Sequence, residues 1–242
     1  MMDFPGFNYS KRSHFDMFKK NHYGKFLKKE IDPDLCSIKD YQDLLLFHFT
    51  RDHLPHNPKI LEVGPATGTF RIFSYFSKAS EYWFLDHCNW IDNAPNFKKR
   101  TDCTIISCRP GTFHPGIPNG YFDLVFSNSS ALNPSDPDKI SPDDVFADIN
   151  RMVKPGKYSF HFFDIILKSY YVWTPAVLTV FFQEINPLAP IIPFVDIAGD
   201  TDLWTIPAHI YREVWQPRTK MSLEEFGKPF SYNLFWEKGL KS

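Results

Sequence analysis

Short apolar runs and segments of helical periodicity alternate along most of the chain. Apolar runs of strand length that end at polar or turn-forming residues predict strands, and apolar positions three or four apart predict helices. We expect helices at Ile38–Phe49, Phe70–Phe76 and Pro142–Arg151, and strands at Ile60–Val63, Glu81–Asp86, Cys103–Ser107, Tyr121–Asn128, Tyr158–Asp164, Ile210–Trp215 and Phe230–Trp236. Strands that alternate with helices favour an α/β fold with a parallel sheet.

The two ends of the chain depart from this pattern. Residues 1–30 mix aromatic with basic side chains, which favours a helix with packed rings and a solvated basic face over a site for an anionic partner. Trp173–Phe194 is apolar but studded with prolines, which prevent regular strand pairing and argue against a membrane span. We expect this stretch to cover the protein's core, a ligand pocket, or a second subunit or membrane surface.

The first predicted strand, Ile60–Val63, runs into a loop with glycines at Gly64 and Gly68. A strand, a glycine loop and a helix open the sheets that bind nucleotides, with the ligand beyond the carboxyl end of the strand. Glycine is needed there because the chain turns sharply and the ligand approaches the backbone closely. Ala66 and Thr69 stand where a dinucleotide fingerprint needs its second and third glycines, so that fingerprint is not matched.

Asp86 ends the second predicted strand, about 20 residues after the first glycine. In this architecture an acid at that place accepts two hydrogen bonds from a ribose diol. The alternative is an aspartate that caps the next helix or ends the strand. The glycine loop upstream favours the ribose role.

Four motifs, in family order, resemble those of class I S-adenosylmethionine (SAM)-dependent methyltransferases. The E-x-G-x-x-x-G pattern of Glu62–Gly68 is similar to the family's first motif, and Asp86 follows at the end of the second strand. Phe122-Asp123 begins a run that resembles the family's fourth strand, F-D-x-V. Arg151–Lys157 resembles its R-x-L-K-P-G-G turn, with lysine in place of the last glycine.

The resemblance implies a Rossmann-like sheet of seven mostly parallel strands with helices on both faces. It implies one domain over residues 1–242. Residues 1–58 would form a helical N-terminal lid, 59–165 the donor-binding core, 166–209 an inserted apolar cap over the acceptor, and 210–242 the final strands.

The resemblance also implies SAM as methyl donor and S-adenosylhomocysteine as product. Glycine lets the backbone approach the donor, Asp86 binds its ribose, and the Asn128 carbonyl faces its ammonium group. Glu62 orients the loop or reaches that ammonium through water, and His87 lies beside the adenine. The full set implied for the donor is Glu62, Gly64, Ala66, Gly68, Asp86, His87, Gly111, Thr112, Phe113 and Asn128.

The acceptor side rests on two residues at the end of the fifth predicted strand. His161 and Asp164 are the candidate catalytic residues, as proton acceptors. The alternative for His161 is simple packing within the strand. The pair lacks a third metal ligand, so we expect no metal.

Charge and composition narrow the acceptor. The 242 residues have a net charge of -1 and a pI of about 6.7, which is unlike the basic footprint of a general nucleic-acid binder. Asn128-Ser-Ser-Ala131 also differs from the N-P-P-Y run of enzymes that methylate base amines. We therefore expect an O- or N-methyltransferase that acts on a small molecule, with an apolar or aromatic part if the cap lines its pocket. The alternative is a non-catalytic protein of this fold that serves as a partner subunit.

Cysteines and the start of the chain bear on location. The four cysteines form no C-x-x-C pair, which favours neither a disulfide framework nor a zinc site. Lys11 and Arg12 interrupt any apolar secretory signal, so we expect a cytoplasmic protein without a transmembrane segment. A homo-oligomer is left open.

Overall fold

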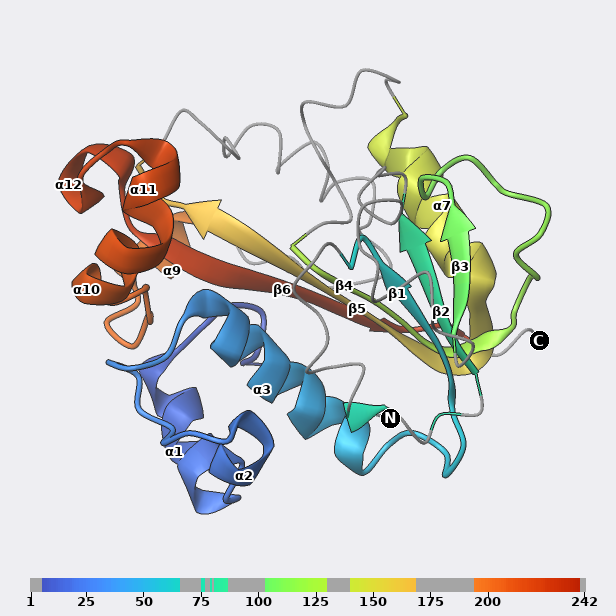
Figure 1. The fold of residues 1–242 in the computed structure, drawn as a ribbon, viewed down its shortest axis with the longest axis horizontal. Coiled ribbons are helices and arrows are strands. Elements are labelled where there is room, and N and C mark those ends of the chain that lie inside the picture. Colours follow the sequence, from blue (N-terminus) through green and yellow to red (C-terminus); the bar gives the residue numbers. More distant parts are fainter. Residues whose placement is uncertain are drawn as a thin grey trace.

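The computed structural model describes residues 6–65, 75–76, 79, 81–86, 103–129, 140–168 and 194–239. Within them, six strands form one sheet in the order β3-β2-β1-β4-β5-β6 (Figure 1). The strands are β1 (Lys59–Val63), β2 (Glu81–Asp86), β3 (Thr104–Ser107), β4 (Phe122–Asn128), β5 (Val153–Ile166) and β6 (Pro229–Glu237). All neighbouring strands are parallel except β5 and β6. The predicted α/β fold and mostly parallel sheet are therefore confirmed.

The central strands are apolar because both faces of the sheet are covered. Every residue of β4 from Phe122 to Ser127 is buried, as are the residues of β1 from Ile60 to Val63. Parallel strands covered on both sides need this composition. The predicted bounds of all strands except the fifth and sixth predicted ones agree with the structure to within one residue.

The helices before β1 lie on one side of the sheet, and the last of them packs against it (Figure 1). They are α1 (Arg12–Lys20), α2 (Gly24–Leu27) and α3 (Ile38–Arg51). A capping box starts α3: the Ser37 side chain accepts from the Asp40 N–H, and the Asp40 side chain accepts from the Ser37 N–H. The apolar stripe of α3 then packs on the sheet, where Phe49 contacts Phe160 of β5 and Phe235 of β6.

The opposite face is covered by α7 (Pro142–Met152). Ser141 caps this helix by accepting from the Asp144 N–H at 3.0 Å, and Pro142 occupies the first turn, where no N–H is needed. The buried apolar residues of α7 are Val145, Phe146, Ile149 and Met152.

The long strand β5 begins earlier than expected. Phe122 pairs with Val153 and Leu124 pairs with Tyr158, so residues 154–157 form a bulge opposite one residue of β4. Gly156 has φ +72° there. The predicted K-P-G turn is thus a bulge inside a strand.

The last third contains helices where we expected a strand. They are α9 (Phe194–Gly199), α10 (Ala208–Ile210), the π-helix η1 (Tyr211–Trp215), α11 (Gln216–Thr219) and α12 (Leu223–Phe226). The predicted strand at Ile210–Trp215 is therefore wrong. Tyr211 and Trp215 both pack on Phe226, with ring centroids 5.6 and 5.7 Å away. A strand would hold residues four apart about 13 Å from each other, too far to share one ring.

Three features of the prediction are not settled by these elements. A seventh strand is not found among the described residues, and the lid and cap remain predictions. Most of the predicted helix Phe70–Phe76 and of the apolar stretch Trp173–Phe194 lies outside the described residues.

The segment Asn8–Ser10 lies along β6. Tyr9 forms an antiparallel bridge with Tyr232, and the Ser10 N–H donates to the Ser231 carbonyl at 2.9 Å. The Asn233 N–H donates to the Asn8 carbonyl at 2.7 Å. This segment therefore occupies the outer side of the last strand.

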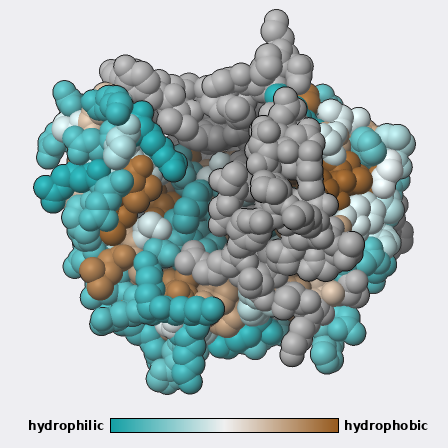
Figure 2. All heavy atoms as spheres, in the orientation of Figure 1, coloured by the Kyte–Doolittle hydropathy of each residue, from teal (hydrophilic) through white to brown (hydrophobic). Residues whose placement is uncertain are grey.

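On the face of the molecule that Figure 2 shows, the described apolar residues are scattered between polar ones. In the space-filling view, hydrophobic atoms form separate patches among hydrophilic side chains (Figure 2). Among the described residues, the large hydrophobic side chains that are exposed are Leu35, Phe113 and Val214. No helix in the described part of the chain is long and apolar enough to cross a membrane.

Candidate functional site

Three predicted donor residues lie in one row at the carboxyl edge of the sheet. Val63 pairs with Leu85 on one side and Ser127 on the other, so the next positions, Gly64, Asp86 and Asn128, lie side by side where β1, β2 and β4 end. The row crosses the point where the strand order reverses, between β1 and β4. Ligands of open α/β sheets bind at such a switch point.

Gly64 makes the turn that the first motif requires. Its N–H donates to the Leu85 carbonyl at 2.7 Å, which continues the ladder one residue past β1. Its φ is +63°, in the left-handed region where a side chain is unfavourable. Ala66, Gly68 and His87 lie outside the described residues.

Glu62 lies in the core below this row. It is fully buried, and the Tyr82 hydroxyl donates to its carboxylate at 2.6 Å. Burial and, second, the charge of Glu62 raise the pKa of Tyr82 well above its usual value. Tyr82 therefore stays a hydrogen-bond donor and fixes the carboxylate below the loop.

Asp86 ends β2 at the same edge. It is buried and pairs in register with Ser107, the last residue of β3. A buried acid at the end of a strand beside the switch point fits the ribose role.

The loop after β3 is fixed to α7. The N–H groups of Gly111 and Phe113 donate to the Asp148 carboxylate at 2.9 and 3.1 Å, and Arg151 pairs with the same carboxylate at 2.7 Å. Gly111 has φ +92°, and a Cβ there would lie 2.4 Å from Ile140. The turn brings Phe113 to the surface with 44% of its area exposed.

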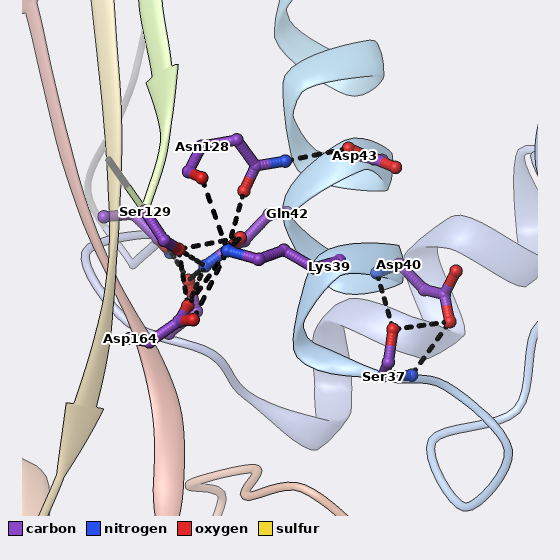
Figure 3. A network of polar contacts seen from close by, with 10 residues as sticks. Ser37, Lys39, Asp40, Gln42, Asp43, Asn128, Ser129 and Asp164 are labelled. Carbon is purple, nitrogen blue, oxygen red and sulfur yellow. Dashed lines mark hydrogen bonds and ion pairs between the residues drawn. The ribbon is translucent and has the colours of Figure 1, made fainter. Parts of the chain in front are cut away.

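A polar network joins α3 to the ends of β4, β5 and β6 (Figure 3). We call it the Asp164 network; its members are Lys39, Gln42, Asp43, Asn128, Ser129, Asp164 and Ser231. Gln42 Nε2 and Ser129 Oγ donate to Asp164 Oδ1 at 2.8 and 2.5 Å. Lys39 adds an ion pair at 3.3 Å. The oxygens of Asp164 are thus already in use as acceptors.

Asn128 is held by the same helix. Its Nδ2 donates to Asp43 Oδ1 at 3.0 Å, and its backbone carbonyl accepts from Lys39 Nζ at 3.3 Å. Sequence reasoning missed the polar residues of α3 because it used only the apolar stripe. Their spacing was the available signal, since residues three and four apart lie on one side of a helix.

His161 occupies the other face of the sheet. It is fully buried, with Nδ1 2.7 Å from Ser127 Oγ and Nε2 2.8 Å from Ser159 Oγ. Its ring stacks on Trp236 at 5.1 Å. Burial lowers the pKa of His161 to about 3, so the ring is neutral at physiological pH. This geometry supports the packing alternative.

The opposite end of the strands carries a surface hollow of about 450 Å³ with lysines in its wall. Two of its three lysines are paired: Lys59 Nζ lies 3.3 Å from Glu81 Oε1 and over the Tyr121 ring, and Lys157 Nζ lies 3.9 Å from Asp123 Oδ1. The third is Lys154. Because it is at the amino ends of β1 and β4, the hollow is separate from the switch point. Elsewhere in the described residues, no group of three or more His, Cys, Asp or Glu could hold a metal ion.

Comparison with known proteins gives matches in structure only. No protein-family model and no curated protein matches the sequence. YcgJ from Bacillus subtilis has a TM-score of 0.52 and 12% identity, over 83% of this chain and 99% of that one. The [4+2]-cyclase SpnF has a TM-score of 0.56 and 13% identity, over 95% and 96%.

A third structure is described as a methyltransferase with ligands bound. It is phosphoethanolamine N-methyltransferase 2 from Haemonchus contortus, in complex with phosphomonomethylethanolamine and S-adenosylhomocysteine. Its TM-score is 0.50 and its identity 13%, over 95% of this chain and 61% of that one. At such identities the likeness concerns the fold, which is the Rossmann-like fold of class I SAM-dependent methyltransferases.

Proposed function

We propose that this chain is a SAM-dependent methyltransferase that transfers a methyl group to the oxygen or nitrogen of a small molecule. The observation that carries the proposal is the row of Gly64, Asp86 and Asn128 at the switch point of the sheet. A glycine turn, a ribose-binding acid and a backbone carbonyl at a strand end are the three groups that an adenosyl amino acid needs there.

Each residue of the row has a task. Gly64 allows close approach of the backbone, and the Asp86 carboxylate accepts hydrogen bonds from the ribose hydroxyls. The Asn128 carbonyl accepts from the ammonium group of the amino-acid part. SAM supplies the electrophilic methyl carbon when it is bound. We further assign Glu62 to support of the loop.

The remaining predicted donor contacts belong to the proposal as well. Gly111, Thr112 and Phe113 would lie beside the adenine, with the loop held in place by Asp148. Ala66, Gly68 and His87 complete the set, on the family resemblance alone.

The hydrogen bonds that the two candidate bases, His161 and Asp164, already make limit the chemistry of the methyl acceptor. His161 is enclosed by two serines, and Asp164 already accepts from Ser129, Gln42 and Lys39. We therefore assign Asp164 to positioning of the acceptor first and to proton acceptance second. Methyl transfer would rest mainly on proximity, which suits an acceptor whose lone pair is free without deprotonation, such as an uncharged aromatic or ring nitrogen.

The fold alone does not fix the reaction, as the [4+2]-cyclase among the similar structures illustrates. Isothermal titration calorimetry with SAM and S-adenosylhomocysteine is the first test, with NAD as the ligand that should not bind. A chain that binds neither adenosyl compound would refute the proposal and favour a non-catalytic partner subunit.

Asp86→Asn sharpens the test because it keeps the size of the side chain and removes its charge. Loss of charge-assisted hydrogen bonds to the ribose should weaken binding by about 1.5–3 kcal/mol. Asp52→Asn, on an exposed residue at the end of α3, is the matched control and should bind normally. Equal affinity in Asp86→Asn would show that the donor lies elsewhere.

A further inference from the structure

The carbonyl that we assign to the donor's ammonium group already has a cation beside it. Lys39 Nζ lies 3.3 Å from the Asn128 carbonyl oxygen and 3.5 Å from Asn128 Oδ1. The lysine side chain is 48% exposed, so its end faces solvent at the carboxyl edge of the sheet. Figure 3 shows this chain reaching from α3 across to Asn128 and Asp164.

The geometry of an amino acid relates this cation to the donor. In an α-amino acid, the ammonium nitrogen and the nearer carboxylate oxygen are only about 3 Å apart, because two bonded carbons separate them. An ammonium bound to the Asn128 carbonyl therefore brings its own carboxylate to within a few ångströms of Lys39. The carbonyl oxygen has two lone pairs and can accept from both cations.

The charges in the Asp164 network also favour contact between Lys39 and the carboxylate of the donor. Among its charged members, Asp43 and Asp164 are anions and Lys39 is the cation. Glu62 and Asp86 add two buried acids at the adjacent strands. This surrounding suits the ammonium and sulfonium groups of SAM but would repel its carboxylate. A carboxylate bound here needs a positive partner, and Lys39 has the reach and the exposure to provide it.

Lys39 can take this role without leaving Asp164 unsupported. Gln42 and Ser129 donate to Asp164 at 2.8 and 2.5 Å, both shorter than the 3.3 Å ion pair to Lys39. The lysine contact is thus the longest of the three and the one that a ligand could share.

We propose that Lys39 is a donor-binding residue that pairs with the α-carboxylate of SAM and S-adenosylhomocysteine. The proposal rests on the function proposed above, since it uses the Asn128 carbonyl as the ammonium site. It adds α3 to the donor site and makes the amino-acid part of the ligand a point of recognition.

The test compares two ligands on two proteins. S-adenosylhomocysteine has the carboxylate, and its decarboxylated analogue, S-adenosyl-3-thiopropylamine, retains the amine but lacks the carboxylate. Calorimetry should show that Lys39→Met binds S-adenosylhomocysteine on the order of tenfold more weakly than the unmodified chain. It should bind the decarboxylated analogue with unchanged or slightly higher affinity. Lys39→Arg should restore much of the loss, since arginine also pairs with carboxylates.

Controls separate this proposal from the proposed function. Lys19→Met removes an exposed lysine of α1 and should change neither affinity. Thermal melting of each variant checks that it is folded. Equal weakening of both ligands in Lys39→Met, or no weakening of either, would overturn the role of Lys39 while the unmodified chain still bound S-adenosylhomocysteine. Failure of the unmodified chain to bind either ligand would overturn the proposed function and this role with it.

Discussion

His161 and Asp164 lie three residues apart on β5 and belong to opposite faces of the sheet. His161 faces α7, where Phe146 and Trp236 surround it. Asp164 faces α3 and lies 14% exposed beside Lys39. β5 therefore carries a histidine that packs in the core and an acid that belongs to the polar network at the edge of the sheet.

The chemical type of a residue does not say which face of the sheet it occupies, whereas its odd or even position along the strand does. Successive side chains of a strand point to opposite faces, so residues separated by an odd number cannot share a site on one face. His161 has the parity of Phe163 and Ile165, which both belong to the α7 side. Three experiments test whether His161 and Asp164 differ in this way.

The largest effect is expected from His161→Ala. The change opens a cavity beside Trp236 and removes the partner of two buried serine hydroxyls, which should cost about 2–4 kcal/mol of unfolding free energy. Denaturant unfolding at pH 7.5 measures the cost, and S-adenosylhomocysteine affinity should stay unchanged in the folded variant. A stability within 0.5 kcal/mol or so of the unmodified chain would contradict a core role.

The second expected effect is a loss of folding stability at acidic pH. The pKa of His161 is about 3 in the folded protein and near 6.5 in the unfolded chain, so the unfolded state binds more protons between these values. Stability should therefore fall as pH drops below 6.5, and His161 alone should account for on the order of 2 kcal/mol between pH 7.5 and 5.

A variant isolates this contribution from that of other groups. His14, whose pKa burial lowers to about 4, acts in the same direction in every variant. The stability gap between the unmodified chain and His161→Gln should narrow from pH 7.5 to pH 5 in denaturant unfolding. A gap that keeps its size would mean that His161 is charged or accessible in the fold.

The smallest effect on stability is expected from Asp164→Asn. The amide keeps one oxygen as acceptor for Gln42 and Ser129, and the ion pair that it loses is with Lys39, which is half-exposed, so the cost should be about 1 kcal/mol or less. Turnover of the acceptor, once identified, should fall more than stability does. A loss of stability equal to that of His161→Ala would place Asp164 with the core residues instead.

Most of the sheet could be read from the sequence because parallel strands buried on both faces leave continuous apolar runs. β1 and β4 are of this kind, and their ends mark the candidate site. The motif glycine Gly64 was equally readable, since its positive φ is a local requirement of the turn.

The wrong and the missing predictions concern segments whose conformation or surroundings depend on contacts with residues distant in the sequence. Ile210–Trp215 has the β-branched and aromatic composition of a strand, but shared packing of Tyr211 and Trp215 on Phe226 favours a helix. Lys39 and Gln42 look like the solvated side of an amphipathic helix until α3 is placed against the ends of β4 and β5. A sequence pattern shows which residues are polar, but it does not show which distant strand end their side chains will contact.

The segment that runs along β6 has a consequence for how copies of the chain meet. β6 is the last strand of the described sheet, and a bare edge strand offers unpaired N–H and C=O groups to any other extended chain. Asn8, Tyr9 and Ser10 occupy part of that edge with their own backbone. These few residues thereby prevent another chain from pairing with this part of the edge. A chain cut just after them would expose that part of β6 to strand pairing between molecules, which leads to aggregation.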